Sequence, residues 1–292
     1  MPAASVVVPT YNRAHLLPRA LQALVEQDYP FEYEILVVDD GSSDATSEVL
    51  ADWTQRYPLR VRHLRQENTG PARARNRGAA AARGWYVAFI DDDCVPERSW
   101  LAGLEEALQR TPAAAGGVVN CGGGWVGRYI NLESVIDHAK VPNGTVAEPI
   151  TLNFAVRTEV FRELGGFDES IRVAGGEDTE FGLRLRAAGH TISYVPDARV
   201  HHQSRTGLVD YLRMIFRHGR GRRGLGERAP AYRLNAPGLR LLWLLWPFRA
   251  WMLKDYSRYR RGGVPRGEAA AYVGLRYLEN AVRMVGYLRG AR

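Results

Sequence analysis

Short apolar runs alternate with amphipathic segments along the first 90 residues of the chain. The apolar runs read as strands covered on both faces, as in a parallel sheet, and they lie at residues 5–9, 35–38, 61–64 and 85–90. The segments between them have the spacing or composition of helices, at about 13–27, from the capping residues 42–44 to about 57, and at 71–83. Four strands thus alternate with three helices, which predicts an α/β fold with βαβ units and a mostly parallel sheet flanked by helices.

This alternation ends beyond Gly116. Further elements are predicted as strands at 152–156, 191–195 and 199–202 and a helix at 177–188. After Gly207 the sequence is helical in pattern, basic and aromatic. The expected domains are therefore an α/β domain at 1–205, with halves at about 1–115 and 116–205, and a helical C-terminal region at 206–292.

The two cysteines, Cys94 and Cys121, are too few for a disulfide framework in a chain of 292 residues. We therefore expect a reducing compartment. A packed thiol is favoured over a reactive one at Cys94. The first predicted strand begins at Ser5, and the residues before it are not basic as those at the start of a signal peptide are. We therefore expect no signal peptide and a cytoplasmic location.

Charge is distributed unevenly along the chain. Residues 199–292 contain 19 Arg and 1 Lys against 5 acidic residues, a net charge of +15, whereas the whole chain carries +7. The first 198 residues are therefore acidic on balance. This division indicates metal binding and catalysis in the front part and contact with an anionic surface in the tail.

Polar clusters follow three of the predicted strands, where ligands bind in open α/β sheets. They are Pro9-Thr10-Tyr11-Asn12-Arg13, Asp39-Asp40 and Asp91-Asp92-Asp93. Tyr11 is placed to stack on a base, and Asp39 and Asp40 to accept hydrogen bonds from a base or ribose. The alternative is that these residues cap helices and form turns.

The third cluster is the most informative. Three adjacent carboxylates repel one another, but divalent cations such as Mg²⁺ and Mn²⁺ prefer hard oxygen ligands. The alternative interpretation is an acidic turn that starts a helix, because Pro96 and Glu97 follow.

These clusters resemble those of the family 2 glycosyltransferases with the GT-A fold. The resemblance rests on the segments 6–12 (VVVPTYN), 37–44 (VVDDGSSD), 68–70 (NTG), 74–78 (ARNRG) and 90–93 (IDDD) and covers about residues 5–205. It implies inverting transfer of a sugar from a nucleotide-sugar donor, UDP-linked by preference, to an acceptor hydroxyl with the help of Mn²⁺ or Mg²⁺. Such a reaction belongs to bacterial glycan or glycoconjugate synthesis.

The resemblance also implies roles for individual residues. The nucleotide sugar would be bound by the first two clusters, with Pro9, Tyr11 and Asp40 on the nucleoside. Arg75 would face the diphosphate. Asp93 would bind the metal directly, and Asp92 would lie near the ribose or sugar.

A second acidic segment, Gly175-Gly176-Glu177-Asp178, precedes a predicted helix. Acidic residues commonly begin helices, which is the structural alternative. The resemblance implies instead that Asp178 is the general base, with Glu177 binding the acceptor or supporting the base.

Further candidates lie near the later strands. The resemblance favours His202, of the pair His201-His202, as a second metal ligand, and neutral imidazole suits Mn²⁺ better than Mg²⁺. The alternative is a structural histidine. Asn153 and Arg157 flank a predicted strand on the acceptor side of relatives, and we expect them to lie near the acceptor.

The most apolar stretch of the tail is Leu239–Leu253. Its longest uncharged run, Leu241–Phe248, has 8 residues, far below the ~20 that span a bilayer. Its tryptophans and arginines favour contact with an anionic membrane surface, which suits a polyprenyl-linked acceptor. The alternative is packing on the sheet, or a homodimer through the C-terminal helices.

Arginines also crowd residues 213–228, where they could meet the phosphates of a lipid carrier. No nucleic-acid-binding fold is recognisable, so we expect no nucleic-acid partner. A glycine-rich phosphate loop does not follow the first strand, which argues against an NAD-dependent oxidoreductase. The remaining rival to a glycosyltransferase is an inactive, nucleotide-binding scaffold at the membrane.

Overall fold

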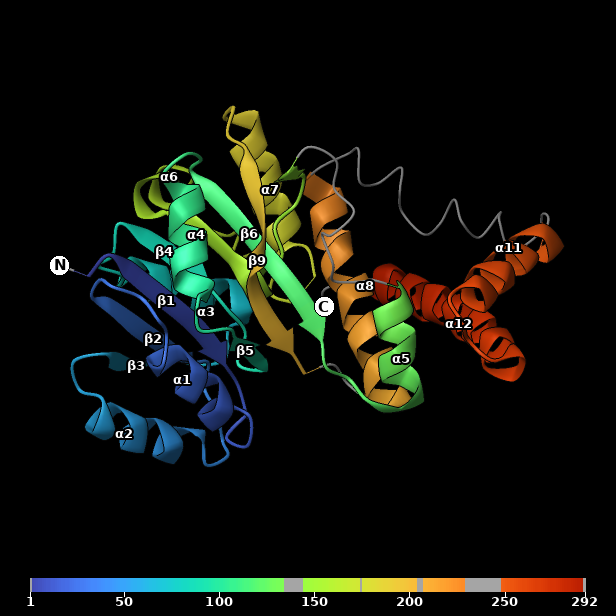
Figure 1. Cartoon of the computed structure of the whole chain (residues 1–292), viewed down its shortest axis with the longest axis horizontal. Helices are drawn as coiled ribbons and strands as arrows, with labels where there is room; N and C mark the ends of the chain where they lie inside the picture. The colour runs from blue at the N-terminus through green and yellow to red at the C-terminus, as the bar shows by residue number, and fades with distance from the viewer. Residues whose placement is uncertain (1, 134–143, 174, 204–206, 229–247, 291–292) are drawn as a thin grey trace. The chain divides into compact units, whose positions relative to one another are not determined.

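The computed structural model describes residues 2–133, 144–173, 175–203, 207–228 and 248–290 (Figure 1). The chain divides into two compact units. We call Met1–Cys121, Ile136–Arg172 and Glu177–Gln203 the sheet unit, and Gly122–Val135, Val173–Gly176 and Ser204–Arg292 the helical unit. Residues 122–135 thus group with the C-terminal helices, although they lie within the predicted α/β domain. The boundary near residue 205 stays a prediction.

The sheet unit contains a nine-stranded sheet and its flanking helices. Its strands are β1 (Ala4–Thr10), β2 (Tyr33–Asp39), β3 (Val61–Arg65), β4 (Tyr86–Phe89), β5 (Cys94–Pro96), β6 (Ala113–Asn120), β7 (Thr145–Val146), β8 (Phe154–Arg157) and β9 (Ile192–His202). Its helices are α1 (Leu17–Val25), α2 (Thr46–Arg56), α3 (Pro71–Ala80), α4 (Trp100–Leu108), the 3₁₀ turn η2 (Thr151–Asn153), α6 (Thr158–Glu163) and α7 (Glu177–Ala187).

The strand order is β3-β2-β1-β4-β8-β6-β9-β5, with β7 paired to β9. The first four strands pair in parallel, as the βαβ pattern predicts. The second half is mixed, because β8 runs antiparallel to both β4 and β6. In the parallel part, Thr10 pairs with Asp39 and Val7 with Phe89. The carboxyl ends of β1, β2 and β4 therefore meet at one edge of the sheet.

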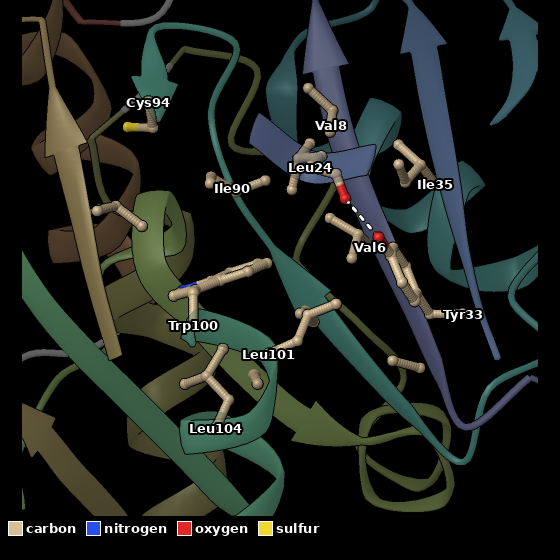
Figure 2. Close-up of a cluster of buried hydrophobic side chains, with 14 of the residues drawn as sticks. Val6, Val8, Leu24, Tyr33, Ile35, Ile90, Cys94, Trp100, Leu101 and Leu104 are labelled. Atoms are coloured by element: carbon tan, nitrogen blue, oxygen red, sulfur yellow. Dashed lines mark hydrogen bonds between the residues drawn. The ribbon is translucent and has the colours of Figure 1, made fainter. Parts of the chain in front are cut away.

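Helices cover both faces of this sheet (Figure 1). One face packs against α1, α2 and α4, and the other against α3, α6 and α7. Figure 2 shows part of the first core, where the indole of Trp100 lies among apolar side chains from strands and helices. In the same view Tyr33 donates a 2.7 Å hydrogen bond to the carbonyl of Leu24, which ties β2 to the end of α1. This buried core fixes the edge of the sheet that carries the carboxylates.

Two predicted strands, 191–195 and 199–202, form the single strand β9. Its ladder with β6 is interrupted, since Gly116 pairs with Val195 and Val118 already pairs with Val200. The four residues Pro196–Arg199 therefore bulge out of the ladder. The interruption begins at Pro196, which lacks the N–H that a ladder residue donates.

The helical unit consists of α5 (Gly124–Glu133), α8 (Leu208–Arg228), α11 (Phe248–Arg261) and α12 (Arg266–Arg289). Its core is aromatic and includes Tyr129, Tyr211 and Tyr272. The buried carboxylate of Glu279 accepts 2.8 Å hydrogen bonds from the hydroxyls of Tyr129 and Tyr211. Glu133 pairs with Arg258 and Arg276, which joins α5 to both α11 and α12.

The apolar stretch Leu239–Leu253 lies largely outside the described residues, which resume at Phe248. Its predicted contact with a membrane surface is therefore not addressed by the structure. Within the described part of the chain, no helix is long and apolar enough to cross a membrane.

Candidate active site

The three aspartates follow β4 at the carboxyl edge of the sheet. Residues Cys94–Pro96 form strand β5, and the next helix begins only at Trp100. The aspartates therefore do not cap a helix, contrary to the structural alternative. Asp92 is buried and accepts a 2.7 Å hydrogen bond from the hydroxyl of Thr10, at the end of β1. Burial, reinforced by the charge of Asp93, raises the pKa of Asp92 to about 7.

Asp93 lies beside His202. The two are brought together by the antiparallel pairing of β5 with β9, in which Cys94 is the partner of His202. Oδ1 of Asp93 is 3.7 Å from Nε2 of His202, and Oδ2 is 3.6 Å from Nη1 of Arg13. The other ring nitrogen of His202, Nδ1, is 3.1 Å from Oδ1 of Asn120 at the end of β6. The structure thus joins two residues that the sequence places 109 positions apart.

The pair Asp93 and His202 fits one side of a divalent metal site. A carboxylate oxygen and an imidazole nitrogen are both ligands of Mn²⁺, and here the two atoms lie 3.7 Å apart. Among the described residues, no group of three or more His, Cys, Asp or Glu side chains is arranged to hold a metal ion. A metal here would need further oxygen ligands, which a diphosphate supplies.

Arg75, on α3, connects the aspartates to the predicted base segment. Its Nη2 donates a 2.7 Å hydrogen bond to Oδ1 of Asp91, and its Nη1 donates a 3.0 Å hydrogen bond to Oε1 of Glu177. The side chain is 6% exposed. Burial alone would lower the pKa of Arg75, but the two carboxylates outweigh it and raise that pKa above its ordinary value. Arg75 thus organises carboxylates in this structure, and its contact with a diphosphate stays a prediction.

Glu177 and Asp178 begin α7. Glu177 is buried against Arg75, whereas Asp178 is half-buried. Oδ1 of Asp178 accepts a 2.8 Å hydrogen bond from the backbone N–H of Thr179. Removal from water, followed by the charge of Glu177, raises the pKa of Asp178 to about 7. A carboxylate with a pKa in this range is a stronger base than an ordinary aspartate, which suits proton abstraction from a hydroxyl.

The residues at the end of β1 and directly after it divide into exposed and structural positions. Tyr11 is 47% exposed, and its ring is accessible for the predicted stacking. Pro9 and Arg13 are half-buried beside it. Asn12 instead has a φ of 53°, and its Oδ1 accepts a 2.8 Å hydrogen bond from the N–H of Ser43. Asn tolerates this left-handed conformation better than most residues. Asn12 therefore joins the loops that follow β1 and β2.

Asp39 and Asp40 both bind the protein itself. Asp39 is fully buried, pairs with Arg65 at 2.6 Å and accepts a 2.8 Å hydrogen bond from the N–H of Ser42. It therefore fixes the turn after β2, as one part of the structural alternative has it, and its contact with a nucleotide stays a prediction.

The carboxylate of Asp40 fixes the loop before α3. It accepts hydrogen bonds of 3.0 Å from the N–H of Thr69 and 2.9 Å from the N–H of Gly70. Gly70 has a φ of 98°, and a Cβ there would lie 2.4 Å from the carbonyl oxygen of Arg172. Glycine is therefore required at the turn that leads into α3. This turn fixes the start of α3, and α3 carries Arg75, which binds Asp91.

The side chains of the two acceptor-side candidates both bind other parts of the protein. Asn153 is buried, and its amide is bonded to the carbonyls of Gly117 and Ala198 and to the indole N–H of Trp100. Arg157 pairs with Tyr86, at the start of β4 and thus at the opposite end from Asp91. Its guanidinium donates to the carbonyl of Leu108 at the end of α4. Both residues hold the fold together in this structure.

The sequence analysis missed Asn120, which contacts His202. The only local signal is its position after Val118 and Val119 at the end of a strand. That strand, β6, was itself not predicted, because its sequence begins Ala-Ala-Ala-Gly-Gly and these residues are poor strand formers.

Comparison with known proteins identifies the family. The model of glycosyl transferase family 2 matches residues 5–165, more than half of the chain. The chain belongs to glycosyl transferase family 2. A second model, glycosyl transferase family group 2, matches residues 86–264. This family-2 glycosyltransferase therefore takes its sugar from a nucleotide-sugar donor.

Curated relatives agree with this family. Glycosyltransferase AglE from Haloferax volcanii is 31% identical over 227 residues, which cover 76% of this chain and 73% of that protein. Validoxylamine A glucosyltransferase from Streptomyces hygroscopicus subsp. jinggangensis is 33% identical over 224 residues. That match covers 65% of this chain and 52% of the relative, so the chain spans about half the length of that enzyme.

Solved structures show the GT-A fold. Mannosyltransferase PcManGT from Pyrobaculum calidifontis, in complex with GDP-Man and Mn²⁺, matches with a TM-score of 0.60 and 22% identity over 96% of this chain and 87% of that one. Staphylococcus aureus TarS (residues 1–349), in complex with UDP-GlcNAc, matches with a TM-score of 0.56 and 19% identity. This match covers 97% of this chain and 89% of that one. At these identities the likeness concerns the fold alone.

Proposed function

We propose that this family-2 glycosyltransferase is a metal-dependent, inverting hexosyltransferase that transfers a sugar from a UDP-sugar to an acceptor hydroxyl. The observation that carries the proposal is the contact of Arg75 with both Asp91 and Glu177. This contact supports the proposal because a single displacement requires the base and the donor to lie close together, and Arg75 binds both segments to which we assign these roles. Two solved structures of the same fold contain Mn²⁺, and TarS contains UDP-GlcNAc.

In this proposal Asp178 takes the proton of the acceptor hydroxyl. The acceptor oxygen forms a bond to the anomeric carbon as the bond from that carbon to the diphosphate breaks, so the configuration inverts. The electron pair of the breaking bond leaves with the nucleoside diphosphate. The raised pKa of Asp178 makes its carboxylate a competent proton acceptor near neutral pH.

The other residues prepare this step. Glu177 and Arg75 hold the first turn of α7 in place, because their pair is buried and hydrogen-bonded. Asp93 and His202 would hold a divalent cation, which supplies positive charge to the departing diphosphate when bound. Arg13, 3.6 Å from Asp93, brings a further positive charge to this end of the site. Tyr11 would stack on the uracil.

We propose a saccharide or polyprenyl-linked acceptor. The arginines of α8 support the lipid-linked form, since Arg213 is an exposed cation and Arg217, Arg222 and Arg223 also lie on exposed positions. Such a surface would favour peripheral binding at the inner face of the plasma membrane. Flotation of the protein with anionic vesicles tests this membrane binding. If the protein does not float with the vesicles at low salt, the lipid-linked acceptor is refuted and a soluble saccharide remains as the proposed acceptor.

The function is tested by a panel of nucleotide sugars, with and without Mn²⁺. We expect one UDP-sugar to release UDP in a metal-dependent reaction that Asp93→Ala abolishes. NMR of the glycosylated product should show an anomeric configuration opposite to that of the donor. Retention of configuration would refute the single displacement, and equal turnover in excess chelator would refute the metal site.

A further inference from the structure

The outward face of α12 carries no charge over most of its length. Arg266 and Arg289 bracket the helix, and between them the exposed positions are Gly267, Ala270, Ala271, Gly274, Leu278, Asn280, Ala281, Val285 and Leu288. The larger side chains are well exposed, at 44% for Leu278, 45% for Val285 and 63% for Leu288. A helix on the surface of a soluble protein normally places charged side chains opposite its buried face. This face is therefore built for contact with something other than water.

Six of these residues form one stripe, separated alternately by three and four positions. We call them the α12 stripe: Ala271, Gly274, Leu278, Ala281, Val285 and Leu288. This period of 3.5 residues is that of the contact positions between two paired helices. The residues that α12 buries in its own unit, such as Tyr272 and Glu279, point elsewhere and already have partners.

We propose that the α12 stripe binds the same stripe of a second copy of this chain, with the two helices antiparallel. In that register Ala271 faces Leu288, Gly274 faces Val285 and Leu278 faces Ala281. Each pair then combines one small and one large side chain, and every contact occurs twice about a two-fold axis. Alternation of small and large residues across facing helices is what fills an interface without voids.

The charges at the helix ends favour the same register. Parallel helices would bring the two Arg289 side chains to the same end of the interface, and like charges close together are unfavourable. Antiparallel helices instead place each Arg289 opposite Ala270, at the far end from the other Arg289. The stripe is thus complementary to itself in one direction and not in the other.

A lipid surface is a weaker match to the stripe. Helices that lie on membranes expose large apolar side chains flanked by Lys and Arg along their length. The α12 stripe has small residues in half of its positions and no basic residue between its ends. Small residues instead allow two helix backbones to approach closely.

Sedimentation velocity of the full-length protein over a range of concentrations tests the proposal. We expect a reversible dimer, and Val285→Glu should raise its dissociation constant about 100-fold, because each dimer would bury two unpaired charges. Asn280→Glu is the matched control, since Asn280 is exposed on the same helix but off the stripe. It should leave the dissociation constant within about twofold.

A charge swap tests the direction of the helices. Ala271→Glu and Leu288→Lys should each weaken the dimer alone, and together they should restore most of its affinity. In antiparallel helices each new carboxylate faces a new ammonium of the other copy, whereas parallel helices would set like charges together. Circular dichroism and the melting temperature of each variant show whether its fold is retained.

Three results would overturn the proposal. Wild-type protein that stays monomeric up to about 100 μM would mean that another segment covers the stripe, residues 229–247 being the first candidate. A Val285→Glu variant that dimerises as well as wild type would place the interface elsewhere. Monomeric protein that floats with vesicles, and loses that property in Val285→Glu, would make the stripe a lipid contact. None of these results depends on glycosyl transfer, so the proposed function is tested separately.

Discussion

Glu177 accepts a 3.0 Å hydrogen bond from Arg75, although 102 positions separate them in the sequence. Both side chains are buried, and their ion pair joins the first turn of α7 to α3. Because Arg75 also holds Asp91, one guanidinium fixes the spacing between the proposed base segment and the aspartates after β4. We therefore expect this pair to matter for the stability of the enzyme and for its proposed activity.

Loss of Arg75 should destabilise the fold. Arg75→Gln leaves Glu177 buried without its ion-pair partner, which typically costs about 3–5 kcal/mol. Arg73→Gln is the matched control on the same helix, because Arg73 makes only an exposed pair with Glu169, worth about 0–1 kcal/mol. Urea unfolding measures both. Equal effects of the two variants would show that the buried pair does not stabilise the enzyme.

Asp178→Asn should lower kcat by about 10² or more, because the acceptor hydroxyl would lose its base. Nucleotide binding, measured by calorimetry with UDP and Mn²⁺, should change little. Glu180→Gln also removes an acidic residue from the first turn of α7, and it serves as the control for helix capping. A comparable fall of kcat in both variants would assign Asp178 to capping alone.

The raised pKa of Asp178 predicts two effects of pH. A base acts only when ionised, so kcat should increase as pH rises through about 7. Asp178→Asn should not show this increase.

The second effect concerns stability, because the folded state binds the proton of Asp178 more tightly than the unfolded state does. This contribution to stability is therefore complete below the ordinary pKa of 3.8 and is lost as pH rises through about 7. The melting temperature of Asp178→Asn should therefore rise relative to that of wild type between pH 3.8 and about 7. A difference in melting temperature that stays constant over this interval would refute the raised pKa.

His202 and His201 offer a matched pair for the metal site. His202→Ala should weaken Mn²⁺-dependent binding of UDP by at least about tenfold, since a ligand to the metal is lost. His201 lies next to it in β9 but faces Glu97, 3.2 Å away, so His201→Ala should bind Mn²⁺ nearly as wild type does. Titration of Mn²⁺ by calorimetry in the presence of UDP measures both. If His202→Ala binds Mn²⁺ normally, His202 is structural.

Asn120 should act on the metal through His202. Its Oδ1 lies 3.1 Å from Nδ1 of His202, and such a contact fixes the ring so that Nε2 faces Asp93. Asn120→Ala should weaken Mn²⁺ binding by about 10-fold, whereas Asn120→Asp keeps an acceptor oxygen and should retain most of it. If both variants bind Mn²⁺ equally, the contact does not orient the histidine.

The parallel half of the sheet could be predicted from the sequence because its strands are continuous apolar runs. Val6, Val7 and Val8 in β1 are all buried, and the pattern has no other simple explanation. The second half could not be predicted as well. Its long strand β9 contains a proline and bulges at Pro196–Arg199, and β6 begins with alanines and glycines. Pairing with neighbours stabilises these strands, and local preference does not reveal it.

The carboxylate cluster was located correctly at the ends of strands, but the partners of single residues were not predicted. Asp39 and Asn12 belong to the clusters predicted to bind the nucleotide, and in the structure their side chains bind loop backbone. A side chain that accepts a hydrogen bond from a loop has the same sequence signature as one that accepts it from a ligand. Only the fold distinguishes them, as it does for Arg157 at the far end of β4.

The bond between Tyr129 and Glu279 spans 150 positions of the chain. During synthesis the amino-terminal parts of a protein emerge and fold first. The sheet unit has all of its strands once Gln203 has left the ribosome, whereas α5, which leaves that sheet after β6, must wait for α12 to be made. Contacts so distant in sequence form slowly. An interrupted chain would therefore carry a finished sheet with Tyr129 and the rest of the apolar side of α5 bare, a form that chaperones and proteases recognise.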